Sequence, residues 1–324
     1  MRRNFKILLI SLFLSIPFWL GINVFARESE NFWYTLEMSK NPEVLTATLN
    51  REYIEKKLER IKSDNRIKSS IEESQISSRA SLSVRVRGDE QRIIFESNSG
   101  DQVPIASITK LMTALVAIDN YDYKTIIEIT KQAADREGNS RYGNILAGEK
   151  LTVESLLHIM LIESSNDAAW ALTDPIGDEP FIDLMNLYAK ELGLDSTYFI
   201  NPNGLDPEDP ASPKNYSSAR DLVKLSRHIL AKYPQIFEIT RKDYYQVKNP
   251  DGSIHHLIRQ STNKLLAEEL KTKIIGGKTG WTQLAGGCLL LILEDPETKD
   301  LYFNVVLGAL DRFTEMRKII NAIN

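Results

Sequence analysis

Two short segments, Ser81-Leu-Ser-Val-Arg-Val-Arg87 and Arg92-Ile-Ile-Phe-Glu96, decide how the folded part of the chain begins. The first alternates apolar and polar residues, a period of two that is typical of a strand with one buried face. Gly88-Asp89 separates the two segments, and a glycine at this place favours a tight turn. The sequence therefore predicts a β-hairpin, and we expect the main domain to cover residues 79–324.

Further strands are predicted near the other end of the chain. Segments 243–248 and 253–259 flank Asn249-Pro-Asp-Gly252, a strong turn signal. Three later apolar stretches also have the length and composition of strands: 273–281, 288–294 and 301–310. The closing segment, 311–324, is predicted to be a helix.

The middle of the chain is predicted to be mainly helical. Pro104 opens an apolar stretch through Ile118 that has no polar face, as expected of a helix buried on most sides. Thr152 begins a second helix, and the capping-box pattern Ser218-Ala-Arg-Asp221 begins a third, which Pro234 ends. Strands from both ends of the domain share one sheet only if those ends meet. We therefore expect a mixed α/β fold in which an antiparallel sheet is flanked by helices, with a helical lobe and a cleft between the two.

The N-terminus predicts export. Basic residues at positions 2, 3 and 6 precede an uncharged, largely apolar stretch from 7 to 25, and this order directs the following chain outward. Val24-Phe25-Ala26 fits a signal-peptidase site, but the stretch is also long enough to remain as a membrane anchor. Residues 1–26 are therefore expected to be a signal peptide or an N-terminal anchor. Either interpretation places the domain outside the cytoplasmic membrane, secreted or attached to it.

Residues 27–78 are expected to form a helical stalk and a linker. Asn41 and Pro42 are typical of a helix start. Apolar residues then recur at roughly helical spacing, at Leu45, Leu49, Tyr53, Leu58 and Ile61. Residues 64–78 are polar and rich in serine, which suits a linker. An amphipathic spacer helix explains this pattern more simply than a dedicated partner site.

Composition excludes several classes of protein. The chain has 42% hydrophobic and 26% charged residues and a net charge of −4, so nothing favours nucleic-acid binding. Its one cysteine, Cys288, excludes an internal disulfide and a thiolate metal cluster, and it lies in a predicted buried strand. Of the four histidines, the adjacent pair His255-His256 falls on a predicted strand, where neighbours point to opposite faces. We therefore expect no metal site and no cofactor.

Three short motifs occur in order along the chain: Ser107-Ile-Thr-Lys110, Ser164-Ser-Asn166 and Lys278-Thr-Gly280. Residues three apart share one face of a helix, so Lys110 can reach the Ser107 hydroxyl. A serine hydroxyl is a weak nucleophile until a base takes its proton, and an amine acts as that base only when neutral. A second ammonium nearby, for which Lys278 is the candidate, would favour the neutral form of Lys110.

The second and third motifs supply the remaining polar groups. Ser164 and Asn166 follow an apolar run, in a predicted turn where a hydroxyl can relay a proton and an amide can bind a substrate peptide group. Lys278 offers a cation for a substrate carboxylate, and Thr279 adds a hydroxyl. The glycines of this segment, Gly276, Gly277 and Gly280, leave backbone bare for an extended peptide to lie against.

In this order the motifs make the chain resemble the low-molecular-mass penicillin-binding proteins, the serine D-Ala-D-Ala carboxypeptidase family. The resemblance covers about residues 80–310 and implies the fold shared by β-lactamases and D,D-peptidases. The segments that carry it beyond the motifs are 104–114, 147–154, 163–169, 201–206, 216–221 and 277–282.

The resemblance implies peptidoglycan stem peptides ending in D-Ala-D-Ala as substrate, and β-lactams as covalent inhibitors. The catalytic residues that it implies are Ser107, Lys110 and Ser164. The substrate-binding residues that it implies are Asn166, Lys278, Thr279, Gly280 and Trp281. Ser107 would be acylated with Lys110 as its base, and Lys278 and Thr279 would hold the terminal carboxylate. The backbone N–H groups of Ser107 and Trp281 would form the oxyanion hole.

Three alternatives were weighed against this interpretation. A D,D-endopeptidase that cuts peptidoglycan cross-links would use the same site, and the sequence does not separate it from a carboxypeptidase. A catalytically silent scaffold would keep the same cleft, because fold alone does not prove function. A class A β-lactamase would need a deacylating glutamate, and the comparable stretch Tyr198-Phe-Ile-Asn-Pro-Asn-Gly-Leu205 has none.

Overall fold

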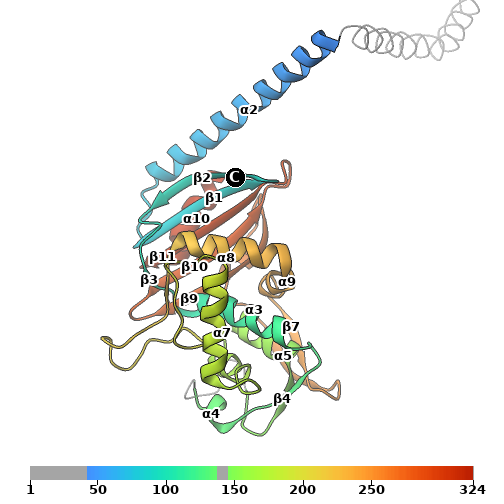
Figure 1. Ribbon diagram of the computed structural model, residues 1–324, viewed down its shortest axis with the longest axis vertical. Coiled ribbons are helices and arrows are strands. Elements are labelled where there is room, and N and C mark those ends of the chain that lie inside the picture. Colours follow the sequence, from blue (N-terminus) through green and yellow to red (C-terminus); the bar gives the residue numbers. More distant parts are fainter. Residues whose placement is uncertain (1–41, 137–144, 324) are drawn as a thin grey trace, which may run out of the picture. The chain divides into compact units, whose positions relative to one another are not determined.

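The computed structural model describes residues 42–136 and 145–323, and at its centre lies a five-stranded sheet (Figure 1). Its strands are β1 (Ala80–Arg87), β2 (Glu90–Ser97), β9 (Lys273–Thr282), β10 (Gly286–Glu294) and β11 (Leu301–Ala309). The order across the sheet is β2-β1-β11-β10-β9, and all neighbours are antiparallel. The two ends of the domain meet where β1 pairs with β11. The predicted mixed α/β fold with one shared antiparallel sheet is confirmed.

Helices and short strands fill the chain between the β1–β2 hairpin and β9. The helical elements are η1 (Ala106–Thr109), α3 (Lys110–Asn120), α4 (Lys131–Ala134), α5 (Val153–His158), η2 (Ile159–Glu163), α6 (Asn166–Ala171), α7 (Asp178–Glu191), α8 (Ala219–Lys232), α9 (Gln235–Thr240) and η3 (Lys264–Ala267). The short strands pair as β3 (Val103–Pro104) with β6 (Tyr216–Ser217), β4 (Ile126–Glu128) with β5 (Lys150–Thr152), and β7 (Tyr245–Lys248) with β8 (Ile254–Ile258). The last helix is α10 (Arg312–Ile323).

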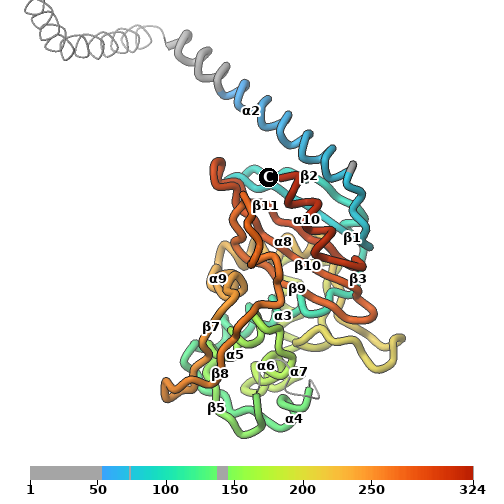
Figure 2. The backbone as a smooth tube through the Cα atoms, turned by 180° about the vertical axis from the view of Figure 1, so that it is seen from behind, coloured from blue at the N-terminus to red at the C-terminus, as the bar shows by residue number. Residues whose placement is uncertain are grey.

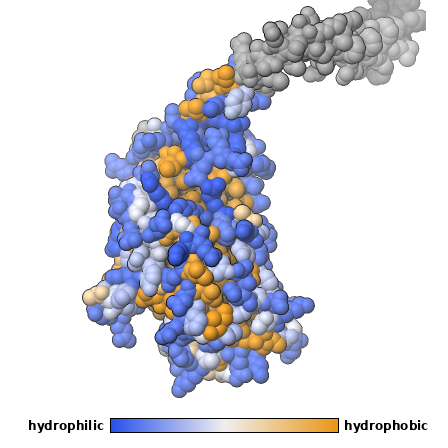
Figure 3. Space-filling view, viewed as in Figure 1, coloured by the Kyte–Doolittle hydropathy of each residue, from blue (hydrophilic) through white to orange (hydrophobic). Residues whose placement is uncertain are grey.

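Each face of the sheet is covered by different elements, because successive strand residues point to opposite faces. On one face, Leu82 and Val84 of β1 belong to a core shared with α8 and the helical lobe. On the other face, Leu291 of β10 packs in a second core with Met316 and Ile320 of α10. Figure 1 shows α8 on the near side of the sheet, and Figure 2 shows α10 across the far side. The surface in Figure 3 is accordingly mostly hydrophilic, with hydrophobic residues in separate patches.

Helix α8 begins where the capping-box pattern predicts. The Oγ of Ser218 accepts a hydrogen bond of 3.1 Å from the backbone N–H of Asp221, which satisfies one of the free donors at the helix start. The helix ends at Lys232, just before Pro234, as predicted. Leu222 and Ile229 lie on its buried stripe, so the helix is held mainly by packing against the sheet.

Helix α2 (Pro42–Glu73) continues through much of the stretch that was expected to be a linker. Ile67 and Ile71, four residues apart, lie on one face of its last turns and are buried with Ile94 of β2. Residues 64–78 were expected to be a polar linker, and these two apolar positions within it were not singled out. None of the helices within the described ranges combines the length and hydrophobicity of a membrane span. The expected signal peptide or anchor, residues 1–26, lies outside the described residues.

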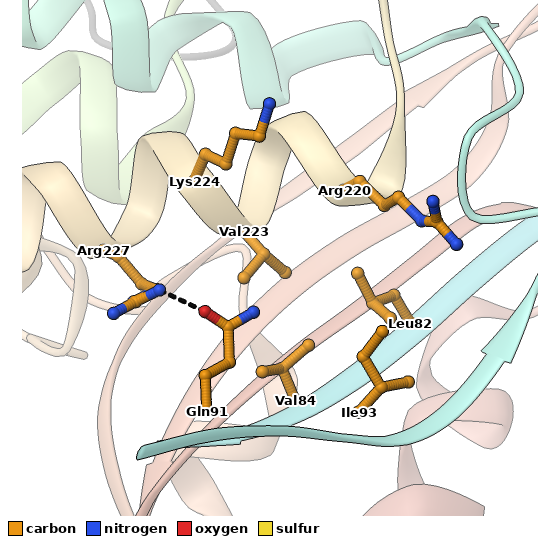
Figure 4. A pocket seen from close by; sticks show the side chains of 8 residues that line it. All are labelled: Leu82, Val84, Gln91, Ile93, Arg220, Val223, Lys224 and Arg227. Carbon is orange, nitrogen blue, oxygen red and sulfur yellow. Dashed lines mark hydrogen bonds between the residues drawn. The ribbon is translucent and has the colours of Figure 1, made fainter. Parts of the chain in front are cut away.

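A groove of about 240 Å³ lies between α8 and the β1–β2 hairpin (Figure 4). Apolar side chains of both elements form its floor, and three cations of α8 border it: Arg220, Lys224 and Arg227. Each cation is engaged within the protein. Arg220 binds Glu96 at 2.7 Å, Lys224 donates to the carbonyl of Gly193, and Arg227 donates to Gln91. The contacts of Arg220 and Arg227 therefore fasten α8 to the hairpin, and that of Lys224 joins it to the segment after α7.

The contrast between a buried and an exposed leucine tests this packing. Leu291 lies in β10, between its neighbours β9 and β11, and is 0% exposed beneath α10. Leu310 is fully exposed. We expect Leu291→Ala to lower the free energy of unfolding by about 2–5 kcal/mol, because it leaves a cavity that the sheet cannot close. Leu310→Ala is expected to change it by less than about 0.5 kcal/mol. Urea unfolding of both variants checks this, and equal losses would contradict the assigned core.

Candidate active site

Ser107 lies in η1, a single 3-10 turn directly before α3. The sequence analysis began the helix at Pro104, but Pro104 is extended and pairs with Tyr216 in the β3–β6 ribbon, so the first helical residue is Ala106. Ala106 has a φ of 48°, in the left-handed region that non-glycine residues rarely adopt. This conformation lies next to Ser107, where the backbone passes from strand to helix.

Lys110 is 0% exposed, and three oxygen atoms surround its amine. Its Nζ lies 2.9 Å from Ser107 Oγ, 2.7 Å from Asn166 Oδ1 and 2.8 Å from the carbonyl oxygen of Asn203. The S-x-x-K spacing thus places amine and hydroxyl in contact, as predicted. The first two motifs also meet here, through Lys110 and Asn166.

Ser164 lies at a special turn between η2 and α6. η2 is one turn of π-helix, and Ser164 follows it with a φ of 68°, again left-handed. Ser165 then caps α6, since its Oγ accepts a hydrogen bond of 3.2 Å from the N–H of Ala168. The Oγ of Ser164 lies 2.8 Å from Nζ of Lys278, which joins the second motif to the third. Strained backbone of this kind persists where surrounding contacts hold it, often at functional sites.

Strand β9 places the third motif along the cleft. Lys278 is 1% exposed and also donates to the carbonyl of Thr279 at 3.1 Å. Burial, together with repulsion from Lys110 and Arg312, holds the pKa of Lys278 well below its ordinary value of 10.5. The hydroxyls of Thr279 and Thr262 are 2.7 Å apart, so Thr262 fixes the rotamer of Thr279.

Gly280 allows β9 to approach the turn that carries Ser107. A Cβ atom at Gly280 would lie 2.9 Å from the carbonyl oxygen of Ile105 and 3.1 Å from the backbone nitrogen of Ser107. Any side chain would therefore push the strand away from the turn that carries Ser107. The next residue, Trp281, is 63% exposed at the edge of the cleft.

The cleft has a volume of about 250 Å³ and is open to solvent. Residues from distant parts of the chain line it: Ser107, Glu163, Ser164, Asn166, Leu205, Thr262, Thr279, Gly280, Trp281 and Arg312. Lys110 and Lys278 are buried beside it and are hydrogen-bonded to Ser107 and Ser164. All eight residues that the sequence singled out are therefore gathered at one site.

Arg312, in the first turn of α10, was missed by the sequence analysis. It lines the cleft, its Nε is buried and has no hydrogen-bond partner among the described residues, and burial lowers its pKa. No short motif marks it. The one signal in the sequence is that a cation at a helix N-terminus opposes the helix dipole, which suggests a role other than helix stability.

The histidine pair corrects another expectation. His255 and His256 were expected to point to opposite faces of a strand, but their ring centroids are 4.9 Å apart. The register between β7 and β8 shifts at Val247 and Lys248, so His255 is the extra residue of a β-bulge. Cys288 does behave as predicted, because it is buried in β10 and burial raises its pKa to about 11.

Among known proteins, a family model described as D-alanyl-D-alanine carboxypeptidase matches residues 68–310. The chain is 32% identical to D-alanyl-D-alanine carboxypeptidase DacF of Bacillus subtilis over 67% of this chain and 54% of that protein. It is 36% identical to the D-alanyl-D-alanine endopeptidase of Escherichia coli over 61% of this chain and 62% of that protein. The chain thus spans about half to three fifths of the length of these curated relatives.

A similar solved structure is that of penicillin-binding protein D2 from Listeria monocytogenes in its ampicillin-bound form. It superimposes with a TM-score of 0.61 at 28% identity, covering 76% of this chain and 97% of that one. The similarity in fold thus extends over most of the domain described above.

The buried Lys278 gives a pH-dependent prediction. The unfolded chain keeps its lysine proton up to about pH 10.5, whereas the folded protein releases it at lower pH, so wild-type stability should rise with pH in this window. The limiting slope from one such group is about 1.4 kcal/mol per pH unit. We expect Lys278→Met to flatten the rise, measured by urea unfolding at several pH values from neutral to about pH 10.

Lys273→Met is the matched control, because Lys273 is an exposed lysine at the start of the same strand. It should keep the wild-type pH dependence. The same slope in wild type and Lys278→Met would contradict the lowered pKa of the buried amine.

Proposed function

The chain belongs to the D-alanyl-D-alanine carboxypeptidase family of peptidases, and from this premise we propose that it is a serine D,D-carboxypeptidase. It would remove the terminal D-Ala from peptidoglycan stem peptides through an acyl-enzyme on Ser107. The observation that carries the proposal is the buried amine of Lys110, 2.9 Å from Ser107 Oγ. A nucleophile in contact with a shielded base is what acyl transfer to serine needs.

The surroundings of Lys110 suit a base that gains and loses one proton. A neutral amine has two N–H donors, which Asn166 Oδ1 and the Asn203 carbonyl accept, and one lone pair, which the Ser107 hydroxyl approaches. After proton transfer the ammonium has three donors for the same three oxygens, so nothing needs to move. Repulsion between the buried amines of Lys110 and Lys278 acts on both, and this pair releases a proton more easily than an isolated lysine.

In the first half of the reaction, Ser107 Oγ attacks the carbonyl carbon between the two D-Ala residues, and its proton moves to Lys110. The negative oxygen that develops is stabilised by the backbone N–H groups of Ser107 in η1 and Trp281 in β9, two segments that Gly280 allows to lie close together. The C–N bond then breaks. Ser164, hydrogen-bonded to Lys278, gives its proton to the departing amine, and the proton that Lys110 took from Ser107 replaces it, so Lys110 is neutral again before water enters.

In the second half, water attacks the ester carbonyl and gives its proton to Lys110. The bond between that carbon and Ser107 Oγ breaks, and Ser107 recovers its proton. The products are the shortened stem peptide and free D-Ala, and the groups of the enzyme return to their starting state.

Arg312 and Thr279 would bind the carboxylate of the terminal D-Ala. Arg312 borders the cleft with a buried, unpartnered Nε among the described residues, and Thr279 presents a hydroxyl beside it. A guanidinium suits this task because its planar donors match a carboxylate. Lys278 was expected to take this role, but its amine is turned to Ser164 and the Thr279 carbonyl, so it would act on the carboxylate through its charge.

β-Lactams would acylate Ser107 as substrate mimics, a proposal supported by the ampicillin-bound form of the structurally similar Listeria protein. The wall lies outside the cytoplasmic membrane, so we also propose that the domain is exported. The basic residues followed by the apolar stretch at positions 7–25 support export, with that stretch as a signal peptide or an anchor.

A D,D-endopeptidase is the second candidate. It would cut the bond at a cross-link, where the departing amine belongs to a second stem peptide rather than to free D-Ala. The similarity to the Escherichia coli endopeptidase favours it, as do the exposed Trp281 and Leu205 at the edge of the cleft, which leave apolar surface for a larger substrate. Incubation with a pentapeptide stem and with a cross-linked dimer, followed by mass spectrometry of the products, separates the two activities.

The nucleophile is tested by labelling with fluorescent penicillin. We expect wild type to be labelled covalently and Ser107→Ala not to be, because the Ser107 hydroxyl lies 2.9 Å from the Lys110 amine that would take its proton. The sequence contains a second S-x-x-K match at Ser261, and Ser261→Ala is the matched control that should be labelled like wild type. Equal labelling of Ser107→Ala and wild type would remove Ser107 as nucleophile. Labelling without any peptide product would favour the silent scaffold.

The role of Arg312 is tested by comparing substrates that have or lack the C-terminal carboxylate. We expect Arg312→Ala to lower kcat/KM for a pentapeptide stem about tenfold to a hundredfold, the loss typical of a charge-assisted hydrogen bond. The same stem with a C-terminal amide should be hydrolysed poorly by wild type and should lose little more in the variant. An equal fractional loss on both substrates would show that Arg312 does not bind the carboxylate.

A further inference from the structure

A chain of four ionisable side chains reaches the cleft from the β7–β8 ribbon, and the proposed reaction does not use it. Because His255 is the bulged residue, its ring turns towards that of His256, and the two Nδ1 atoms are 2.6 Å apart. His255 Nε2 lies 3.2 Å from a carboxylate oxygen of Glu149, and His256 Nε2 lies 3.1 Å from one of Glu163. We call Glu149, His255, His256 and Glu163 the histidine clamp.

The imidazoles of the clamp are largely buried, and its carboxylates are partly exposed. The side chains of His255 and His256 are 7% and 14% exposed, and those of Glu163 and Glu149 are 20% and 33% exposed. The Glu149 carboxylate also accepts a hydrogen bond of 2.9 Å from the backbone N–H of Leu146. The ionisable groups that contact the two imidazoles are therefore the two carboxylates, one from the segment before β5 and one from η2.

The contacts of the clamp fix how many protons it can hold. Both Nε2 atoms face carboxylates and need a proton to donate, whereas the Nδ1–Nδ1 contact needs a single proton between the two rings. The four ring nitrogens of the two histidines therefore carry three protons, so one imidazole is neutral and the other is an imidazolium. If one proton were missing, one of the three contacts of the clamp would have no hydrogen-bond donor. If one were added, the two Nδ1–H groups would face each other across 2.6 Å.

A metal ion does not explain the arrangement. Two nitrogen ligands at tetrahedral zinc lie about 3.3 Å apart, given metal–nitrogen bonds of about 2.0 Å, whereas the facing Nδ1 atoms here are 2.6 Å apart. Within residues 42–136 and 145–323 no group of three or more potential ligands has metal-binding geometry. The arrangement fits a shared proton.

The clamp ends on the residue that precedes Ser164. Glu163 closes η2, and Ser164 takes the left-handed φ of 68° that directs its hydroxyl to Lys278. The backbone of this turn is tied to β9 only indirectly, through the hydrogen bond of 3.1 Å from the N–H of Thr262 to the carbonyl of Ile162. The contact between His256 and Glu163 is a second tether, on the side next to Ser164.

We propose that the histidine clamp shares one proton between its two imidazoles and holds the Ser164 turn for proton transfer to the leaving amine, with His256 as a positioning residue. The contact of His256 with Glu163 tethers the residue that precedes Ser164. The positioning role rests on the acyl-enzyme reaction proposed above.

The test compares acylation rates by fluorescent penicillin for wild type, His256→Ala and His256→Gln. A glutamine amide can donate to Glu163, whereas alanine cannot. We expect His256→Ala to react about tenfold more slowly than wild type, and His256→Gln to react within about threefold of it.

His228→Gln is the matched control, because His228 lies on α8 at a separate pocket and contacts Tyr233. It should react at the wild-type rate. A wild-type rate in His256→Ala would overturn the clamp as a positioning device, and so would a failure of glutamine to rescue the alanine variant. Circular dichroism confirms that the variants are folded.

A second measurement is independent of activity. Nitrogen-15 NMR of the imidazole rings in the full chain reports which ring nitrogens carry protons, and at about pH 6 we expect both Nε2 atoms protonated with one proton on the two Nδ1 atoms. Two separately protonated neutral imidazoles at that pH would overturn proton sharing. Absence of penicillin labelling in wild type would instead overturn the proposed function, and the positioning role with it, while the NMR result would still decide whether the proton is shared.

Discussion

The burial of the Lys110 amine is the constraint on which the rest of the site depends. An amine removed from water must keep its hydrogen bonds or lose several kcal/mol. Its three oxygen partners come from η1, from α6 and from the loop that contains Asn203, so these segments can only pack in one arrangement around it. The buried amine of Lys110 thus holds these segments of the helical lobe together. A site held in this way is ordered before substrate arrives, which is what preorganised catalysis requires.

The sheet completes this arrangement from the other side, and there the cost is electrostatic. Lys278 brings a second buried amine into the cleft, and Arg312 brings a guanidinium, with burial lowering the pKa of both. Two buried amines and a guanidinium around one small volume repel one another when protonated, but positive charge there suits a ligand that carries a carboxylate. The cleft is therefore a region where stability is lower than packing alone would give, a balance common at functional sites. The two apolar cores on either face of the sheet supply the compensating stability.

Several short-range devices let the two lobes meet without a gap. Gly280 allows β9 to lie against the Ser107 turn, and the left-handed residues Ala106 and Ser164 bend the backbone sharply beside the reacting groups. The bulge at His255 works in the same way, because one extra residue turns an imidazole from the opposite face of the strand towards its neighbour. Each device is local, but each has a function only because another segment lies within reach. This explains why strained or irregular backbone collects around the cleft.

The strands, the main helices and the residues of the three motifs can be predicted from the sequence alone, because each depends on a short period: two for strands, and three or four for a helical face such as Ser107 and Lys110. The shared sheet can be predicted as well, since strands at both ends of the domain have to pair. Packing between distant segments, in contrast, brings Arg312 to the cleft, buries Ile67 and Ile71, and turns His255 and His256 towards each other. These facts depend on which distant segment packs against a residue. A bulge or a helix docked from afar changes the face that a side chain presents without leaving a local pattern to read.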